Sequence, residues 1–487
     1  MNKERSFLKI GLVYVIGQLL SKAISFIMLP IYTRELGAME FGKLSLADTV
    51  MDFISVFLIV TIFSGYTRFY RDYKKEDRGR LRNTAITFAI FLLVIDILFF
   101  LIFGKIIASK VLNFDNSYYM FFLIFLRGII SQFISLLICD YTLKYEAKKI
   151  VIVNLVMLVL NITFVIILVV VKRQGIFGVY KGYIYGSAII LVYLIIKNIK
   201  TFKLELDKSM LKKMVVFSGG LIPSGISGTI LNLADRYFLT SYEGFVQTGI
   251  YSIGYKIGML INPIFIAPFT SIFVPYKFQI YKSKESHEKI NKMFKIYNIV
   301  GVFIVLAITL YSKFFIYIFA TSEYMAAYNI ISLILFSYFL YGKAEFYTIG
   351  MQIANKTYLD AIVMGIGGVI NIILNIILIP KIGMYGAAIS TLFSYGIMNS
   401  LYNYISQKMY SIKFNNFISI KVYFIYGFIF LLYKILSFIN KNLIIEFIVN
   451  IFLLAMYIFI CIKLKLISYE ILLHYINRVK NKLFKCN

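Results

Sequence analysis

Ionisable side chains inside long apolar runs are the residues of this sequence that could do chemistry. Lys22 lies within the first run, and Asp48 and Asp52 share one helical face of the second. At about 1.5 Å of rise per residue, Lys22 and Asp48 would both lie roughly 11 Å inside a membrane, where antiparallel helices could pair them. Because such charges are costly unless they meet a partner or a cavity, two interpretations stay open. One is a structural salt bridge, and the other is a cavity site for an anionic substrate or a coupling ion.

Further charges lie in later runs. Lys256 shares a helical face with Ser252 and has no acidic residue nearby in the sequence, which indicates either a cation that binds an anion or a lysine that snorkels or forms a local pair. Arg127 lies near the middle of its run and is equally a functional or a structural candidate. Asp235 and Arg236 fall near the end of a run, where they either mark the membrane interface or form a site.

One apolar run is interrupted by helix-breaking residues. The segment from Ser218 to Gly228 holds one proline and four glycines, which should bend or break a helix. They either allow close helix packing or form a hinge for alternating access. The hinge candidates are Gly219, Gly220, Pro223, Gly225 and Gly228.

The composition indicates that these apolar runs lie in a membrane. Of the 487 residues, 60% are hydrophobic and 15% are charged, whereas soluble proteins carry about 25% charged residues. The net charge of +28 would suggest nucleic acid in a soluble protein, but here the basic residues lie in short loops and serve as topology signals. Three scattered cysteines and two histidines predict no disulfide framework, no metal site and no histidine-based catalysis. No nucleotide-binding motif is present, so we expect a secondary transporter and not an enzyme.

The apolar runs predict an all-α polytopic membrane protein with about 14 transmembrane helices. The expected spans are 8–29, 41–64, 83–103, 119–139, 151–171, 177–196, 214–240, 247–274, 296–319, 328–350, 359–379, 382–405, 417–436 and 443–466. The first run has no cleavage site and is expected to be a helix, not a removed signal peptide. Alternate loops carry 35 and 11 Lys and Arg residues, which predicts that both termini are cytoplasmic.

Two glycine motifs recur at nearly one spacing. Phe41-Gly42 corresponds to Thr248-Gly249, 207 residues later, and Gly175-Ile176 corresponds to Gly383-Met384, 208 residues later. Since six spans is an even number, the two copies would be parallel lobes around a central cavity. The expected domains are an N-lobe at 1–200, a C-lobe at 201–410, and two helices with a basic cytoplasmic tail at 411–487.

Four stretches carry a family resemblance. They are Gly11 to Tyr32 with Leu36-Gly37 and Phe41-Gly42; Thr67 to Tyr70; Asp235 to Leu239 with Gly249 to Ser252 and Tyr255-Lys256; and Asn371 to Asn375 with Ile379 to Gly383, Gly386 to Ala388 and Thr391. Together they resemble the bacterial oligosaccharide flippases of polysaccharide biosynthesis. These belong to the multidrug/oligosaccharidyl-lipid/polysaccharide (MOP) exporter superfamily. The resemblance covers about residues 6–405.

The resemblance implies a flippase that moves an undecaprenyl-pyrophosphate-linked oligosaccharide repeat unit to the outer leaflet by alternating access. Cations would hold the pyrophosphate, because a diphosphate in a low-dielectric cavity needs counter-charge. The substrate-binding candidates are Lys22, Arg34, Arg68, Arg127, Arg236 and Lys256, and the ion-coupling candidates are Asp48, Asp52 and Asp235. H⁺ or Na⁺ would be the coupling ion, with no further cofactor and no metal site.

The expected setting is the bacterial cell membrane, where the chain would act as a monomer among membrane lipids. A polysaccharide polymerase and glycosyltransferases are its expected protein partners, and nucleic acid is not. Two alternatives from the same superfamily stay open: a lipid II flippase and a cation-coupled multidrug exporter. A cation exporter is expected to have an acidic cavity, whereas this chain has basic residues in its spans.

Overall fold

The computed structural model is all-helical in the residues that it describes. It describes the backbone of residues 2–57, 60–439 and 442–467, and the side chains of 27–55, 62–439 and 442–467. Ten helices in this part of the chain are long and apolar enough to cross a membrane. The expectation of an all-α, multi-pass architecture is therefore confirmed. The described residues form two compact units, each of which combines segments from distant parts of the sequence.

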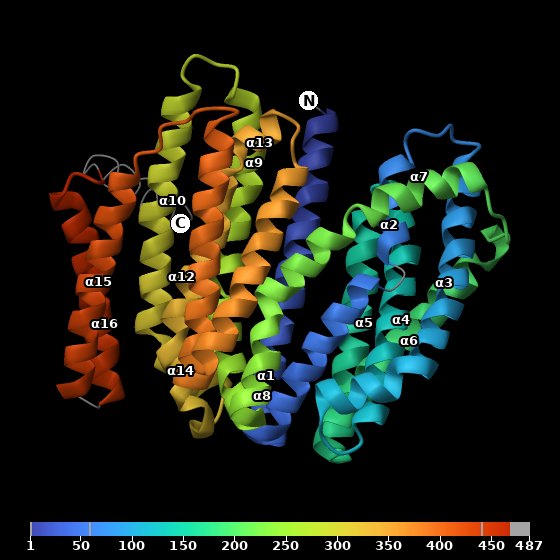
Figure 1. Cartoon of the computed structure of the whole chain (residues 1–487), viewed down its shortest axis with the longest axis horizontal. Helices are drawn as coiled ribbons and strands as arrows, with labels where there is room; N and C mark the ends of the chain where they lie inside the picture. The colour runs from blue at the N-terminus through green and yellow to red at the C-terminus, as the bar shows by residue number, and fades with distance from the viewer. Residues whose placement is uncertain (1, 58–59, 440–441, 468–487) are drawn as a thin grey trace, which may run out of the picture. The chain divides into compact units, whose positions relative to one another are not determined.

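The first unit comprises Met1–Ile253, Tyr317–Ala326 and Met364–Ser390. Its helices are α1 (Asn2–Phe57), α2 (Val60–Phe69), α3 (Arg78–Ile107), α4 (Ser117–Leu143), α5 (Ala147–Ile166), α6 (Gly175–Asn198), α7 (Lys208–Gly219) and most of α8 (Ile222–Gly258). Helices α3 to α6 pack side by side, with α4 against α5 and α6 (Figure 1). Short helical turns extend several of them, at Ala108–Leu112, Ile167–Val171 and Ile199–Thr201.

The second unit comprises Gly254–Ile316, Ala327–Val363 and Thr391–Asn487. It holds α9 (Ala267–Ile280), α10 (Ser286–Leu310), α12 (Tyr328–Tyr347), α13 (Ile349–Ile353), α15 (Asn416–Ile439) and α16 (Leu443–Lys463), with a helical turn at Asn262–Ile266. Helix α10 packs against α12 and α15, and α15 packs against α16. Helices α11 (Ser312–Phe319) and α14 (Tyr358–Gln407), and the turn Ser322–Ala327, contribute residues to both units.

Three helices, α1, α8 and α14, each run continuously from one expected span into the next. At about 1.5 Å per residue, a straight helix as long as α1 would be about 84 Å, far beyond the roughly 30 Å core of a bilayer. Each of the three changes direction at a glycine: Gly37 in α1 (φ 70°), Gly244 in α8 (φ 82°) and Gly383 in α14 (φ 54°). Glycine adopts a positive φ without a steric penalty, so a single glycine turns the chain in α1 and α8, and Gly383 does so together with Ile382 in α14. After the first kink, the backbone amide of Ala38 donates to Glu323 over 3.1 Å.

The helix is interrupted within the segment Ser218 to Gly228, where its glycines and proline predict a break. Helix α7 ends at Gly219, the chain turns through Gly220 and Leu221, and α8 begins at Ile222 with Pro223 in its first turn. Proline is tolerated in a first turn because the amide there has no helical partner. Of the remaining hinge candidates, Gly225 and Gly228 lie inside the regular start of α8. A hinge movement at this break stays a prediction.

Helices α1 and α8 cross closely through repeat-related residues. A methyl group on Gly42 would lie 1.9 Å from the carbonyl oxygen of Phe245, and one on Gly249 would lie 2.1 Å from that of Ala38. Next to this crossing, the hydroxyls of Ser45 and Ser252 hydrogen-bond over 2.6 Å, 207 residues apart in the chain. Glycine is required at both positions because any side chain would collide with backbone.

Candidate functional site

The main charged cluster of the first unit joins two of the candidate residues. A guanidinium nitrogen of Arg127 on α4 lies 3.2 Å from a carboxylate oxygen of Asp48 on α1. The same oxygen accepts a hydrogen bond of 2.9 Å from the hydroxyl of Tyr180 on α6. The Arg127 side chain is 22% exposed and that of Asp48 is 45% exposed, so this ion pair is open on one side. Lys22, the partner that the sequence suggested for Asp48, lies outside the residues whose side chains are described.

Aromatic rings complete the surroundings of Arg127. The centre of its guanidinium lies 4.1 Å from the ring centroid of Tyr183 and 5.0 Å from that of Tyr180. The Tyr183 hydroxyl in turn hydrogen-bonds to that of Tyr32 on α1 over 3.0 Å. Ring faces stabilise a guanidinium without neutralising it. Arg127 is thus held in place by aromatic rings in addition to its ion pair with Asp48.

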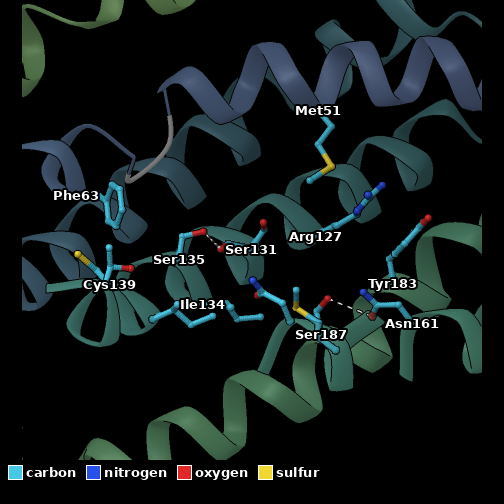
Figure 2. Close-up of a pocket in the computed structure, with 14 residues that line it drawn as sticks. Met51, Phe63, Arg127, Ser131, Ile134, Ser135, Cys139, Asn161, Tyr183 and Ser187 are labelled. Carbon is cyan, nitrogen blue, oxygen red and sulfur yellow. Dashed lines mark hydrogen bonds between the residues drawn. The ribbon is translucent and has the colours of Figure 1, made fainter. Parts of the chain in front are cut away.

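Arg127 lines a cavity of about 400 Å³ inside the first unit. Figure 2 shows its walls, which come from α1, α2, α4, α5 and α6. The lining residues are Met51, Phe63, Arg127, Ser131, Ile134, Ser135, Ile138, Cys139, Thr142, Asn154, Met157, Asn161, Tyr183 and Ser187. Seven of them carry a hydroxyl or an amide, and among these described residues none is acidic. The cavity therefore combines one cation with many neutral hydrogen-bonding groups.

Part of this polar wall is already hydrogen-bonded. The Ser187 hydroxyl contacts the amide oxygen of Asn161 over 3.3 Å, and that of Ser135 donates to the Ser131 carbonyl over 2.9 Å (Figure 2). Gly186 makes the α5–α6 contact possible, because a methyl group there would lie 2.3 Å from the Asn161 side chain. The wall is thus positioned by helix packing and still presents hydroxyl and amide groups to the cavity.

A second charged cluster lies at the crossing of α1 and α8. The Arg236 guanidinium donates to Ser45 over 3.1 Å and to the Asn232 carbonyl over 3.0 Å, and it lies 3.4 Å from Asp235. Asp235 also accepts a hydrogen bond from the hydroxyl of Tyr251. Only 6% of the Arg236 side chain and 1% of the Asp235 side chain are exposed. These two candidates form a closed, fully buried network.

The other candidates differ in position, and Asp52, one turn after Asp48 on α1, interacts electrostatically with Asp48, Arg127 and Arg236. Arg34 and Asp52 are exposed, and Arg68 is exposed and pairs with Asp72 over 3.1 Å. Lys256 is half-buried on α8, in the second unit. In the described ranges, no group of three or more His, Cys, Asp or Glu side chains could hold a metal ion.

Several residues around Arg127 and its cavity were missed by sequence reasoning. Tyr180 and Tyr183 follow the recurring glycine motif, and Asn161 lies mid-span on α5, but none of them is ionisable at neutral pH. A search for polar residues inside apolar runs would have found Asn154 and Asn161. Their convergence on Arg127 depends on the packing of α4, α5 and α6, which a single sequence does not specify.

Comparison with known proteins places the chain in a family. The model of the family described as polysaccharide biosynthesis protein matches residues 7–281, more than half of the chain. An uncharacterized membrane protein of Haemophilus influenzae is 22% identical over 294 residues, which are 59% of this chain and 69% of that protein.

Solved structures share the fold at low sequence identity. A lipid II flippase, MurJ, in an inward closed conformation, has a TM-score of 0.70 and 15% identity over 93% of this chain and 99% of its own. An inward-facing multidrug resistance MATE transporter of the MOP superfamily has a TM-score of 0.66 and 13% identity over 81% and 97%. A MOP superfamily transporter from Pyrococcus furiosus, whose binding pocket is described as reversed in polarity, has a TM-score of 0.58 and 14% identity over 82% and 94%. This chain therefore belongs to the polysaccharide biosynthesis protein family, and it is a multi-pass membrane protein that shares its fold with the lipid II flippase and MATE transporter structures.

Proposed function

We propose that this transporter flips an undecaprenyl-pyrophosphate-linked oligosaccharide from the inner to the outer leaflet of the bacterial cell membrane. The observation that carries this proposal is the cavity around Arg127, which has one cation, seven hydroxyl or amide side chains and no acidic residue among those that line it in the described chain. A cationic drug would be repelled by Arg127, whereas a pyrophosphate would be attracted. This charge favours an anionic substrate over the multidrug-exporter alternative.

The two kinds of lining group suit the two polar parts of such a substrate. Arginine binds phosphate oxygens through two parallel N–H donors, and serine, threonine and asparagine side chains exchange hydrogen bonds with sugar hydroxyls. A volume of about 400 Å³ lies in the range of small-ligand pockets, roughly 300–1,000 Å³. The cavity would therefore take the pyrophosphate and the adjoining sugar, while the lipid tail stays in the bilayer.

The ion pair between Arg127 and Asp48 supports a coupling mechanism. Both the substrate phosphate and the Asp48 carboxylate bind the same guanidinium face, so binding of one displaces the other. A displaced Asp48 would take up H⁺ or Na⁺, and release of that ion would return it to Arg127. Asp52 and Asp235 are weaker candidates, because Asp52 is exposed and Asp235 is enclosed by its own hydrogen bonds.

We further propose two parallel lobes, 1–200 and 201–410, with 411–487 as two additional helices and a tail, for about 14 spans in all. The kinks support this repeat. Gly37 and Gly244 are 207 residues apart with similar φ values of 70° and 82°, and Gly175 and Gly383 are 208 apart with φ of 56° and 54°. The break between α7 and α8 would be the hinge that lets the lobes alternate.

The basic residues of alternate loops support cytoplasmic N- and C-termini. With this orientation, loading would take place from the side of the cell where lipid-linked sugars are assembled. The glycosyltransferases and the polymerase that act on the same lipid would then work on opposite faces of the membrane.

The test is a flipping assay in proteoliposomes. The rate at which a fluorescent undecaprenyl-pyrophosphate oligosaccharide reaches the far leaflet is measured with and without H⁺ or Na⁺ gradients. We expect accelerated flipping that Arg127→Gln removes and that Lys148→Gln, an exposed charge away from the cavity, leaves unchanged. Preferential flipping of lipid II would replace the proposed substrate, and export of a cationic dye without lipid flipping would overturn the proposal.

A further inference from the structure

Helix α7 is a short helix that lies across the ends of α2 and α3 instead of beside them (Figure 1). Its first turn is capped by Asp207, whose carboxylate accepts from the Ser209 hydroxyl over 2.6 Å and from the backbone amides of Ser209 and Met210 over 2.8 and 3.0 Å. These bonds, that from the Ser209 hydroxyl first, hold the pKa of the Asp207 carboxyl below its usual range, so it caps the helix as an anion.

One face of α7 is fixed to the first unit. Met210, Met214 and Ser218, spaced four residues apart, are buried. The backbone amide of Gly65 on α2 donates to the Ser218 hydroxyl over 2.8 Å, and a methyl group on Gly65 would lie 2.5 Å from the Met214 carbonyl oxygen. The orientation of α7 about its own axis is therefore set, and so is the face that it turns away from the bundle.

The opposite face of α7 combines charge with exposed apolar surface. It carries Lys208, Lys212, Val215 and Val216, which fall opposite the buried stripe at helical spacing. Both lysines are exposed, and within the described residues neither makes an ion pair. Val215 is 40% exposed and Val216 is 69% exposed.

The acidic residues of this segment do not neutralise the lysines. Glu205 and Asp207 both bind Arg80 on α3, over 3.1 and 3.4 Å. The outward face of α7 is thus positively charged in its first half and apolar in its second half. At a membrane surface, anionic phosphates lie next to acyl chains. The lysines of α7 suit the phosphates, and the valines that follow them suit the acyl chains.

We propose that α7 is an interfacial helix that binds anionic lipid headgroups through Lys208 and Lys212 while Val215 and Val216 enter the acyl boundary. The inner leaflet is the one that it contacts under the orientation given above. Helix α7 leads through Gly220 and Leu221 into α8, and it packs on α2, which contributes Phe63 to the wall of the Arg127 cavity. Lipid binding by α7 would therefore fix this end of the first unit to the membrane surface. The proposal concerns the membrane and does not depend on which substrate is carried.

The first test measures where Val216 lies. A nitroxide label is placed at Val216→Cys in the full chain with Cys486→Ser, since Cys139 and Cys461 are buried. In vesicles of phosphatidylcholine with phosphatidylglycerol, we expect collisions with oxygen to exceed those with a water-soluble nickel complex. The label at Ser283→Cys, in an exposed loop, should show the reverse. A Val216 label that behaves like the Ser283 label would overturn the proposal and indicate a face for a soluble partner.

The second test separates specific charge from overall charge. The test variant combines Lys208→Gln with Lys212→Gln. Its control combines Lys148→Gln with Lys200→Gln, which removes the same charge from exposed residues elsewhere in the chain. Binding of short-chain phosphatidylglycerol to the detergent-solubilised protein should weaken about tenfold for the α7 pair and little for the control pair. Added salt should weaken wild-type binding in the same direction. Equal behaviour of the two double variants would contradict the proposal.

Discussion

Two arginines of the first unit meet a carboxylate in different ways. Arg127 lines a cavity and pairs with Asp48 on a different helix, and the two side chains are 22% and 45% exposed. Arg236 and Asp235 are neighbours in the chain, and their side chains are 6% and 1% exposed. The Arg236 guanidinium is bonded to Ser45 and to the Asn232 carbonyl, whereas that of Arg127 rests on ring faces.

This difference separates a structural charge from a charge that can act on a ligand. A buried ion pair that is enclosed by further hydrogen bonds cannot release its arginine without leaving a charge uncompensated. An ion pair beside a cavity can exchange its carboxylate for another anion, because the incoming group replaces what is lost. The same residue type therefore holds α1 to α8 in one place and, under the proposed function, would recognise substrate in the other.

The largest expected effect is at Arg236. Arg236→Met leaves Asp235 buried without its cation, which should lower the free energy of unfolding by about 3–5 kcal/mol. Loss of the monodisperse peak on heating, measured by size-exclusion chromatography, reports it. Adding Asp235→Asn removes the stranded charge and should recover most of the loss. A single variant as stable as wild type would show that the network is not structural.

Substitution of Arg127 should lower the rate of transport more than it lowers stability. Arg127→Gln should slow flipping of the pyrophosphate-linked substrate by about 10- to 100-fold, the value of roughly one to two charge-assisted contacts. Arg127→Lys should keep part of the rate, because it keeps the charge and loses the two-pronged geometry. The thermal stability of both variants should change less than that of Arg236→Met. Equal flipping by all three proteins would contradict the assignment.

Asp48 tests whether the open ion pair couples transport to an ion. Asp48→Asn should leave exchange of substrate between leaflets intact while removing its stimulation by an H⁺ or Na⁺ gradient. Tyr180→Phe, which removes one hydrogen bond to Asp48, should have a smaller effect, about 1 kcal/mol. Flipping rates with and without each gradient distinguish these outcomes. A gradient response that survives Asp48→Asn would exclude this carboxylate as the ion carrier.

The smallest effect is expected at the serine pair of the closed network. Ser45→Ala removes the bond to Ser252 and one bond to Arg236, which should cost about 1 kcal/mol of stability. Ser252→Ala should cost less, because Ser45 keeps Arg236 as a partner. Melting temperatures of the two variants check the order, and the reverse order would mean that Arg236 does not depend on Ser45.

The sequence predicted the membrane architecture because that depends on local properties. Apolar runs of spanning length, the break at Gly219 and Gly220, and the spacing of Gly42 and Gly249 are all readable in one chain. Paired spans were expected to be joined by loops, but Gly37 and Gly244 turn the helix within one residue. A positive φ at glycine is compatible with both outcomes, so composition alone could not decide between them.

For the candidate site, the sequence predicted individual residues but not the contacts between them. Asp48 and Arg127 stood out because each is ionisable inside an apolar run, but their pairing across 79 residues depends on which faces of α1 and α4 meet. The sequence allowed Lys22, on the neighbouring span, as a partner of Asp48, and this pairing stays a prediction because the Lys22 side chain lies outside the described residues. Tyr180 and Tyr183 carried no signal, since tyrosine is common in this chain at 39 residues. Helix periodicity orders residues on one helix and does not specify its neighbours.

The central claim is that Arg127 binds the pyrophosphate of the substrate. Its most direct test is the dissociation constant of undecaprenyl pyrophosphate for the detergent-solubilised wild type, Arg127→Gln and the surface control Lys148→Gln. We predict binding about tenfold weaker for Arg127→Gln, the value of one charge-assisted hydrogen bond, and unchanged for the control. Equal dissociation constants for all three proteins would contradict the account and assign Arg127, like Arg236, to the structure of the bundle.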